Sequence, residues 1–113
     1  MADDTAAVWK ALADPTRRAI LDLLHDRAHT TGELSDAFPS KTRFAVMKHL
    51  GVLTRARLIL IERRGRERWN HLNPVPIRQI YERWISEYEG LWAGSLLKLK
   101  RHVEQRNERS VRP

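Results

Sequence analysis

The chain has no cysteine among its 113 residues, which excludes disulfide bonds, thiolate metal sites and thiol redox chemistry. It has no apolar run close to the length of a transmembrane helix. A basic segment followed by an apolar stretch is missing at the start, so no secretory signal is expected. Gly-rich phosphate loops and a nucleophile-elbow serine are also absent. These absences predict a cytoplasmic protein that is not an enzyme and needs no cofactor.

Charge is abundant but unevenly distributed. Residues 1–40 have 4 basic and 7 acidic side chains, whereas residues 41–113 have 17 basic and 7 acidic ones. The excess is greatest in residues 41–68, where nine basic groups face only Glu62 and Glu67. Like charges at this density repel one another unless an anionic partner neutralises them. A solvated basic face is the alternative, and the structure that carries the charges decides between the two.

Two helices are predicted before residue 30. Residues 6–13 have apolar side chains at helical spacing. Asp14 and Pro15 end this helix and begin the next, because Asp is a good N-cap and Pro suits the first helical position. The second helix is expected to fray near His25–His29.

Two further helices follow. Thr30 and Glu33 have the spacing of a capping box, which predicts a third helix from Thr31 to about Phe38. After a tight connection, Thr42 caps a fourth helix over about residues 43–55. Its predicted inner face consists of Val46, His49, Leu50 and Leu53, with His49 expected to pack between helices.

The pattern changes after residue 56. Residues 57–63 are rich in Leu and Ile, residues 68–72 combine Trp with polar side chains, and Gly65 lies in the turn between them. This predicts a two-stranded hairpin with a basic tip. A long helix follows from Ile77 to about Glu104, with apolar residues at every third or fourth position. Residues 105–113 are a polar tail that is expected to fray.

Two helices joined by a tight turn and followed by a hairpin predict a winged helix-turn-helix, within a single domain of residues 1–113. The fold class is mainly α, with five or so helices, a two-stranded antiparallel wing and a long C-terminal dimerisation helix. The helix-turn-helix would span about residues 31–55, and the wing about residues 57–72. In this fold the second helix of the motif enters the major groove of DNA. The predicted DNA-binding residues are Thr42, Arg43, Phe44, Met47, Lys48, Arg63, Arg64 and Arg66.

These residues have different expected roles. Arg43 suits a forked contact with guanine, and Lys48 suits a phosphate or a base. Phe44 and Met47 either contact thymine methyl groups or turn inward and join the core, and the sequence leaves both open. The arginines at the tip of the hairpin would lie over the DNA backbone or minor groove, although charge on a hairpin edge also prevents edge pairing.

The segments Ala11–Leu21 (ALADPTRRAIL) and Val46–Leu53 (VMKHLGVL), with the wing at the expected distance after them, resemble the ArsR/SmtB-type family of repressors. The resemblance covers roughly residues 6–104. It implies a homodimer in which the first and last helices, about residues 4–13 and 77–104, form the subunit contact. It also implies repression by occupying an operator, relieved when an effector binds.

The long last helix supports a homodimer independently, because its apolar stripe is larger than so small a monomer covers. A two-fold dimer places two recognition helices about one DNA turn apart, which predicts an inverted-repeat operator in double-stranded DNA. The alternative is that this helix folds back over its own domain. The predicted interface residues are Val8, Trp9, Leu12, Trp84, Tyr88, Leu91, Trp92, Leu96 and Leu99.

Metal sensing, which the resemblance would suggest, is not predicted. The positions that match the family's metal site on the last helix are Glu89, Leu91, His102 and Gln105, and two of these are poor or absent ligands. A separate group, Asp22, His25, Asp26 and His29, would share one helical face. His25 and His29 are weak candidate ligands for zinc or nickel there, and a solvated helix end is the alternative.

The segments Phe44–Leu50 and Asn73–Ile77 resemble a branch of the family without cysteine sites, which implies a small-molecule effector of unknown identity or none. Two other classes of function are a winged-helix protein-interaction module and a non-specific nucleic-acid-binding protein. A docking module has no need of basic groups that converge on one face. RNA-binding modules have aromatic stacking platforms, which the basic face lacks apart from Phe44 and Trp69. The sequence therefore favours a transcriptional regulator specific for double-stranded DNA.

Overall fold

The structure is a computed structural model that describes residues 4–111, except for the side chains of residues 4, 92 and 108–111. Contacts divide the chain into two compact units, residues 1–78 and residues 79–113, and each unit is described by itself. Among the helices of the described residues, none has the combination of length and hydrophobicity that spans a lipid bilayer.

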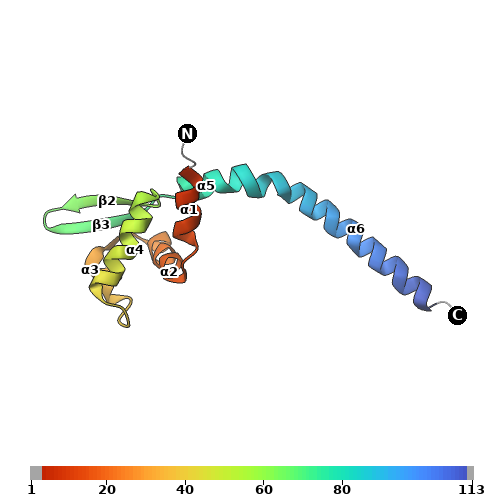
Figure 1. Cartoon of the computed structure of the whole chain (residues 1–113), viewed down its shortest axis with the longest axis horizontal. Coiled ribbons are helices and arrows are strands. Elements are labelled where there is room, and N and C mark those ends of the chain that lie inside the picture. The colour runs from red at the N-terminus through yellow and green to blue at the C-terminus, as the bar shows by residue number, and fades with distance from the viewer. Residues whose placement is uncertain (1–3, 112–113) are drawn as a thin grey trace. The chain divides into compact units, whose positions relative to one another are not determined.

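The first unit begins with α1 (Asp4–Leu12) and α2 (Pro15–Asp26) (Figure 1). Asp14 caps α2 as predicted, because its Oδ1 accepts hydrogen bonds from the backbone N–H groups of Thr16 (2.8 Å) and Arg17 (3.1 Å). Partial burial raises the pKa of Asp14, but these two donors outweigh that effect and hold the pKa below its ordinary value. The cap thus fixes the start of α2.

Arg17 joins three helices. Its Nε donates to the carbonyl oxygen of Ala11 (2.8 Å), and its Nη2 donates to that of Lys10 (3.0 Å), so the guanidinium group caps carbonyls in the last turn of α1. Its Nη1 lies 3.2 Å from Nδ1 of His49 on the fourth helix. His49 therefore packs between helices, as predicted.

The helix-turn-helix consists of α3 (Thr31–Asp36) and α4 (Arg43–Arg55). The predicted capping box is present: Thr30 Oγ1 accepts from the N–H of Glu33 (3.1 Å), and Glu33 Oε1 accepts from the N–H of Thr30 (2.9 Å). The helix α3 ends two residues before the predicted Phe38, because a residue that precedes proline is disfavoured in the helical conformation. The helix α4 has the predicted bounds.

The sheet has three antiparallel strands in the order β1-β3-β2, namely β1 (His29–Thr30), β2 (Ile59–Arg64) and β3 (Glu67–Leu72). The predicted hairpin β2–β3 is present, with Gly65 at φ 62° in its two-residue loop, a position that glycine adopts without strain. The strand β1 was not predicted. Asn70 of β3 holds it, because its Nδ2 donates to the carbonyl of His29 (3.2 Å).

This third strand corrects the predicted grouping of four polar residues. The helix α2 stops at Asp26, within the range where it was expected to fray, and His29 lies in β1, so Asp22, His25, Asp26 and His29 do not share one helical face. His25 pairs loosely with Asp26 (3.7 Å), and His29 Nδ1 lies 2.9 Å from the carbonyl of Arg27. Among the described residues, no group of three or more His, Cys, Asp or Glu side chains is arranged to hold a metal ion.

The core of the first unit fixes the orientation of α4. Its side chains Val46, Leu50 and Leu53 are buried, and α4 contacts α1, α2, α3 and β2. Leu34 of α3 and Ile59 of β2 are buried in the same core. The inner face predicted for α4 is therefore confirmed, and its opposite face is left to solvent.

The last helical segment departs from the predicted single helix over residues 77–104. It consists of α5 (Val75–Ile80), a π-helical turn (Tyr81–Ile85) and α6 (Ser86–Val111). It begins earlier because Asn73 Oδ1 accepts from the N–H of Val75 (3.3 Å). In the π-helical turn, the N–H of Ser86 donates to the carbonyl of Tyr81, five residues back. The expected fraying is wrong for residues 105–111, which are helical.

Candidate nucleic-acid interface

The buried inner face of α4 determines which of its side chains point toward solvent. Thr42 begins the helix, because its Oγ1 accepts from the N–H of Ala45 (3.0 Å). With Val46 and Leu50 buried, the helical spacing turns Phe44 and Lys48 outward, and both are exposed. Arg43 is exposed because it is the first residue of the helix. Met47 is half-buried at the edge of this face.

The wing has two faces with different residues. Cross-strand partners lie on the same face of a hairpin, and successive pairs alternate between faces. The pair Ile61–Asn70 lies on the inner face, because Asn70 is buried against the helices. The next inner pair toward the tip is Arg63–Arg68. The pairs Glu62–Trp69 and Arg64–Glu67 belong to the outer face.

An open groove of about 770 Å³ lies between the helix-turn-helix and the wing, entirely within the first unit. It brings together five of the predicted DNA-binding residues, Arg43, Phe44, Met47, Arg63 and Arg66. Three predicted residues, Thr42, Lys48 and Arg64, do not line it. The residues that line it without having been predicted are Thr30, Thr31, Gly32, Glu67 and Arg68.

The groove is strongly basic. Four arginines line it, Arg43 from α4 and Arg63, Arg66 and Arg68 from the wing. Glu67, whose register position next to the loop belongs to the outer face, is the one acidic residue among those that line it. Within the part of the chain that the structure describes, none of these four arginines forms an ion pair. Uncompensated guanidinium groups that converge on one concavity favour an anionic partner.

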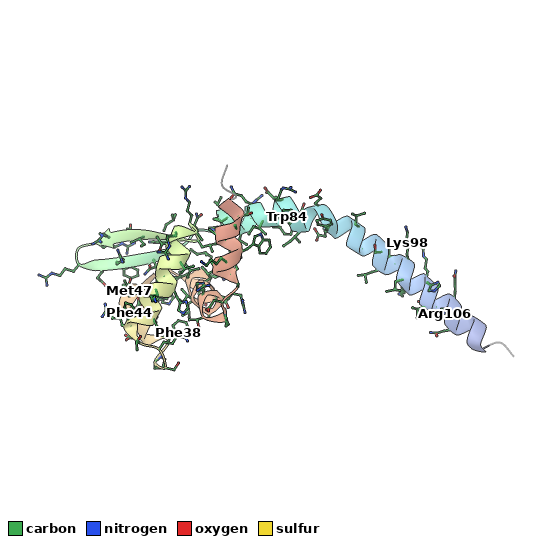
Figure 2. All side chains as sticks on the ribbon, in the orientation of Figure 1. Phe38, Phe44, Met47, Trp84, Lys98 and Arg106 are labelled. Carbon is green, nitrogen blue, oxygen red and sulfur yellow. The ribbon has the colours of Figure 1, made fainter. Side chains whose placement is uncertain are left out.

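Phe44 and Met47 lie on the groove side of α4 (Figure 2). The side chain of Phe44 is 72% exposed, so it does not join the core. The ammonium group of Lys48, one helical turn further on, lies 5.4 Å from the centroid of the Phe44 ring. The question that the sequence left open is thereby answered for Phe44: it is a large apolar side chain at a basic groove.

Arg64 is held on the outer face of the wing. Its Nε and Nη2 both contact Oε1 of Glu62, at 2.8 and 2.7 Å, and its guanidinium carbon lies 4.9 Å from the centroid of the Trp69 ring. Nε2 of His71 also lies 3.2 Å from the same carboxylate. These hydrogen bonds, from His71 and then Arg64, hold the pKa of Glu62 below its ordinary value. Arg64 thus differs from Arg63 in already having an anionic partner.

The residues predicted for a dimer interface differ in exposure. In the first unit Val8 is buried in the core, Leu12 is half-buried and Trp9 is exposed. In the second unit the predicted residues with described side chains are exposed, namely Trp84, Tyr88, Leu91, Leu96 and Leu99. The side chain of Trp92 lies outside the described residues.

Comparison with known proteins decides the family. A family model described as "Helix-turn-helix domain" matches residues 12–62. The chain is 40% identical to the uncharacterized HTH-type transcriptional regulator YuzN of Bacillus subtilis (strain 168) over 85 residues, 70% of this chain and 92% of YuzN. It is 38% identical to the transcriptional repressor SdpR of the same organism over 71 residues, 63% of this chain and 78% of SdpR.

Comparison with solved structures leads to the same family. The crystal structure of an ArsR family transcriptional regulator superimposes with a TM-score of 0.72 and 32% identity, over 80% of this chain and 98% of that one. The chain belongs to the ArsR family of transcriptional regulators. The homodimeric winged helix-turn-helix domain of a possible ArsR-family regulator from Mycobacterium bovis has the same fold, with a TM-score of 0.62 and 24% identity over 77% of this chain and 81% of that one.

The assignment to the ArsR family confirms the fold class and the prediction of a transcriptional regulator with a helix-turn-helix DNA-binding domain, and not an enzyme. For this ArsR-family chain, sequence reasoning missed Arg68. The signal was available, because counting outward from the loop at Gly65 and Arg66 pairs Arg68 with Arg63 on one face. The residues of α3 that line the groove, Thr31 and Gly32, are of types that do not by themselves indicate DNA binding.

Proposed function

We propose that this ArsR-family chain is a repressor that binds an inverted-repeat operator in double-stranded DNA as a homodimer in the cytoplasm. The observation that carries the proposal is the convergence, on the groove between α4 and the wing, of four arginines that form no ion pair with any described residue. A duplex supplies the closely spaced phosphates that such a surface needs, and the adjoining face of α4 supplies side chains for base edges.

Within this interface, Arg43 is the proposed base-reading residue. It stands in the first turn of α4, exposed and free of any ion pair in the described part of the chain. Arg55, in the last turn of the same helix, is also exposed; it does not line the 770 Å³ groove but a smaller hollow of about 260 Å³ further along α4. It provides a matched control for the loss of one positive charge.

The Arg43→Ala variant is expected to lose about 1–3 kcal/mol of binding free energy on its operator and to relax the preference at particular base pairs. Fluorescence anisotropy with the operator and with a scrambled duplex measures both effects. The Arg55→Ala variant should keep the ratio between the two duplexes. Equal losses for both variants on both duplexes would contradict the role given to Arg43.

The proposed subunit contact is the apolar face of the last helix, occupied by the same helix of a second copy. Trp84, Ile85 and Tyr88, with Glu89, line an open and almost wholly apolar depression of about 430 Å³ on this helix. The apolar residues continue along α6 as Leu96 and Leu99. The homodimeric fold neighbour from Mycobacterium bovis supports the same assembly. Trp9 on α1 is a second proposed contact.

Leu97 and Leu99 make a matched pair for testing the dimer. Their side chains are 56% and 58% exposed, but two residues of helix turn them to nearly opposite faces, and only Leu99 lies on the proposed contact face. Leu99→Lys should raise the dimer dissociation constant at least about 100-fold, because a buried Leu is lost twice per dimer. Leu97→Lys should leave it nearly unchanged. Sedimentation velocity measures the constant, and equal effects of the two substitutions would refute the assigned face.

Repression is the proposed mode of regulation because SdpR is a transcriptional repressor and shares 38% identity with this chain. A dimer that occupies a promoter excludes polymerase by simple competition. The proposal includes a small-molecule effector of unknown identity, which would act by changing the affinity for DNA. A reporter gene behind the operator should be silenced by the wild-type chain and released by Arg43→Ala; a reporter that rises with the wild-type chain would contradict repression.

A further inference from the structure

The positive charge of the groove does not explain why Phe44, a large apolar side chain, is exposed there. A single exposed apolar side chain is common on protein surfaces and has no meaning by itself. This one, however, lies in the first turn of the outward face of α4, next to Arg43, and lines the same groove as the wing arginines. Met47, one turn later, extends the apolar surface.

The surroundings of Phe44 restrict what can cover its ring. The Lys48 ammonium group lies 5.4 Å from the ring centroid, and Arg43 precedes Phe44 in the chain, so an approaching molecule meets positive charge together with an apolar surface. An apolar protein partner gains nothing from those charges, whereas duplex DNA presents both kinds of group. The only apolar group on the major-groove edge of a base pair is the C5-methyl group of a pyrimidine.

We propose that Phe44, flanked by Met47, recognises the C5-methyl group of a pyrimidine in the operator. This inference rests on the proposed function and specifies which chemical group the first turn of α4 recognises. Thymine and 5-methylcytosine display this methyl group at the same place in the major groove, whereas uracil and cytosine lack it. Binding should therefore respond to methylation of cytosine at the recognised position as well as to thymine.

The test compares selections from two random duplex libraries, one synthesised with thymidine triphosphate and one with deoxyuridine triphosphate. From the first library the wild-type chain should enrich a half-site with a thymine at a fixed position. From the second library that position should lose its preference, while the positions that depend on Arg43 keep theirs.

Dissociation constants for individual duplexes measure how much the methyl group contributes to binding. Replacing the thymine of one half-site with uracil should weaken wild-type binding about fourfold, as expected for one methyl group removed from an apolar contact. Phe44→Ala should bind the thymine and uracil duplexes equally, and Phe44→Leu should keep part of the difference. Placing 5-methylcytosine instead of cytosine at this position should restore part of the affinity. Because Phe44 is mostly exposed, these substitutions should leave the thermal unfolding temperature unchanged.

Three results would overturn the inference. If the wild-type chain enriches an operator but binds its thymine and uracil forms equally, the methyl group is not recognised, and the proposed function still holds. If Phe44→Ala keeps the wild-type difference between the two forms, another residue makes the contact. If no sequence is enriched from either library, the proposed function fails together with the inference.

Discussion

The two arginines at the end of β2 provide a sharp test of the interface. Arg63 lies on the inner face of the wing, lines the groove and has no ion pair within the described residues. Arg64 lies on the outer face, with Glu62 at 2.7 Å and the Trp69 ring beneath its guanidinium group. Replacing either residue with alanine removes one positive charge at nearly the same position along the chain. A difference between the variants therefore reports direct contact with DNA and not net charge.

The expected magnitude follows from the number of contacts. A charge-assisted hydrogen bond to phosphate contributes about 1.5 kcal/mol net or more, and it is lost twice in a dimer, so Arg63→Ala should raise Kd at least about 150-fold. Each lost phosphate contact also removes about 0.9 from the slope of log K against log salt concentration, so the slope should fall by about 2 per dimer. Arg64→Ala should change Kd less than about threefold, because Glu62 already neutralises this charge.

Fluorescence anisotropy between about 50 and 200 mM salt measures Kd and its salt slope together. Circular dichroism of both variants verifies that the wing substitutions leave the fold intact. Equal losses of affinity and equal slopes for the two variants would refute the assignment of the wing faces. A greater loss for Arg64→Ala would place the outer face against DNA.

Two further predictions concern the scaffold. Arg27 and the capping box hold the pKa of Glu33 at about 2, below its ordinary 4.5, so the stabilisation by this carboxylate is complete above pH 4.5 and is lost as the pH falls toward 2. In urea unfolding, the Glu33→Gln variant should therefore lose less stability than the wild type over that pH range. Parallel plots of unfolding free energy against pH for the two proteins would contradict this prediction. Arg17→Lys should lower the free energy of unfolding by about 1–3 kcal/mol, because an ammonium group does not reproduce the forked contacts with Lys10, Ala11 and His49; an unchanged thermal midpoint would show that these contacts add nothing.

Elements with a local signal were predictable from the sequence. Asp14 before Pro15, the Thr30–Glu33 spacing and Thr42 each act within one helical turn, so the starts of α2, α3 and α4 follow from the residues alone. The hairpin also has a local signal, because Gly65 supplies the positive φ that its loop needs.

Elements that depend on distant partners were not predictable. The strand β1 has only two residues and exists because β3 pairs with it, which no pattern in residues 27–30 indicates. The π-helical turn depends on which carbonyl each N–H selects, and apolar spacing does not report that choice. Because the strand register is not visible in the sequence, Arg63, Arg64 and Arg66 were predicted to form one basic tip. Only the strand register separates Arg64 from the groove and adds Arg68 to it.

The most direct test of the central claim is selection by the wild-type chain from a random duplex library at moderate salt, with competitor DNA, followed by sequencing. A homodimer that places two α4 helices on one face of DNA should enrich an inverted repeat with half-sites about one helical turn apart. Enrichment of a single half-site, or binding of all sequences that disappears steeply with added salt, would contradict a dimeric operator-binding repressor.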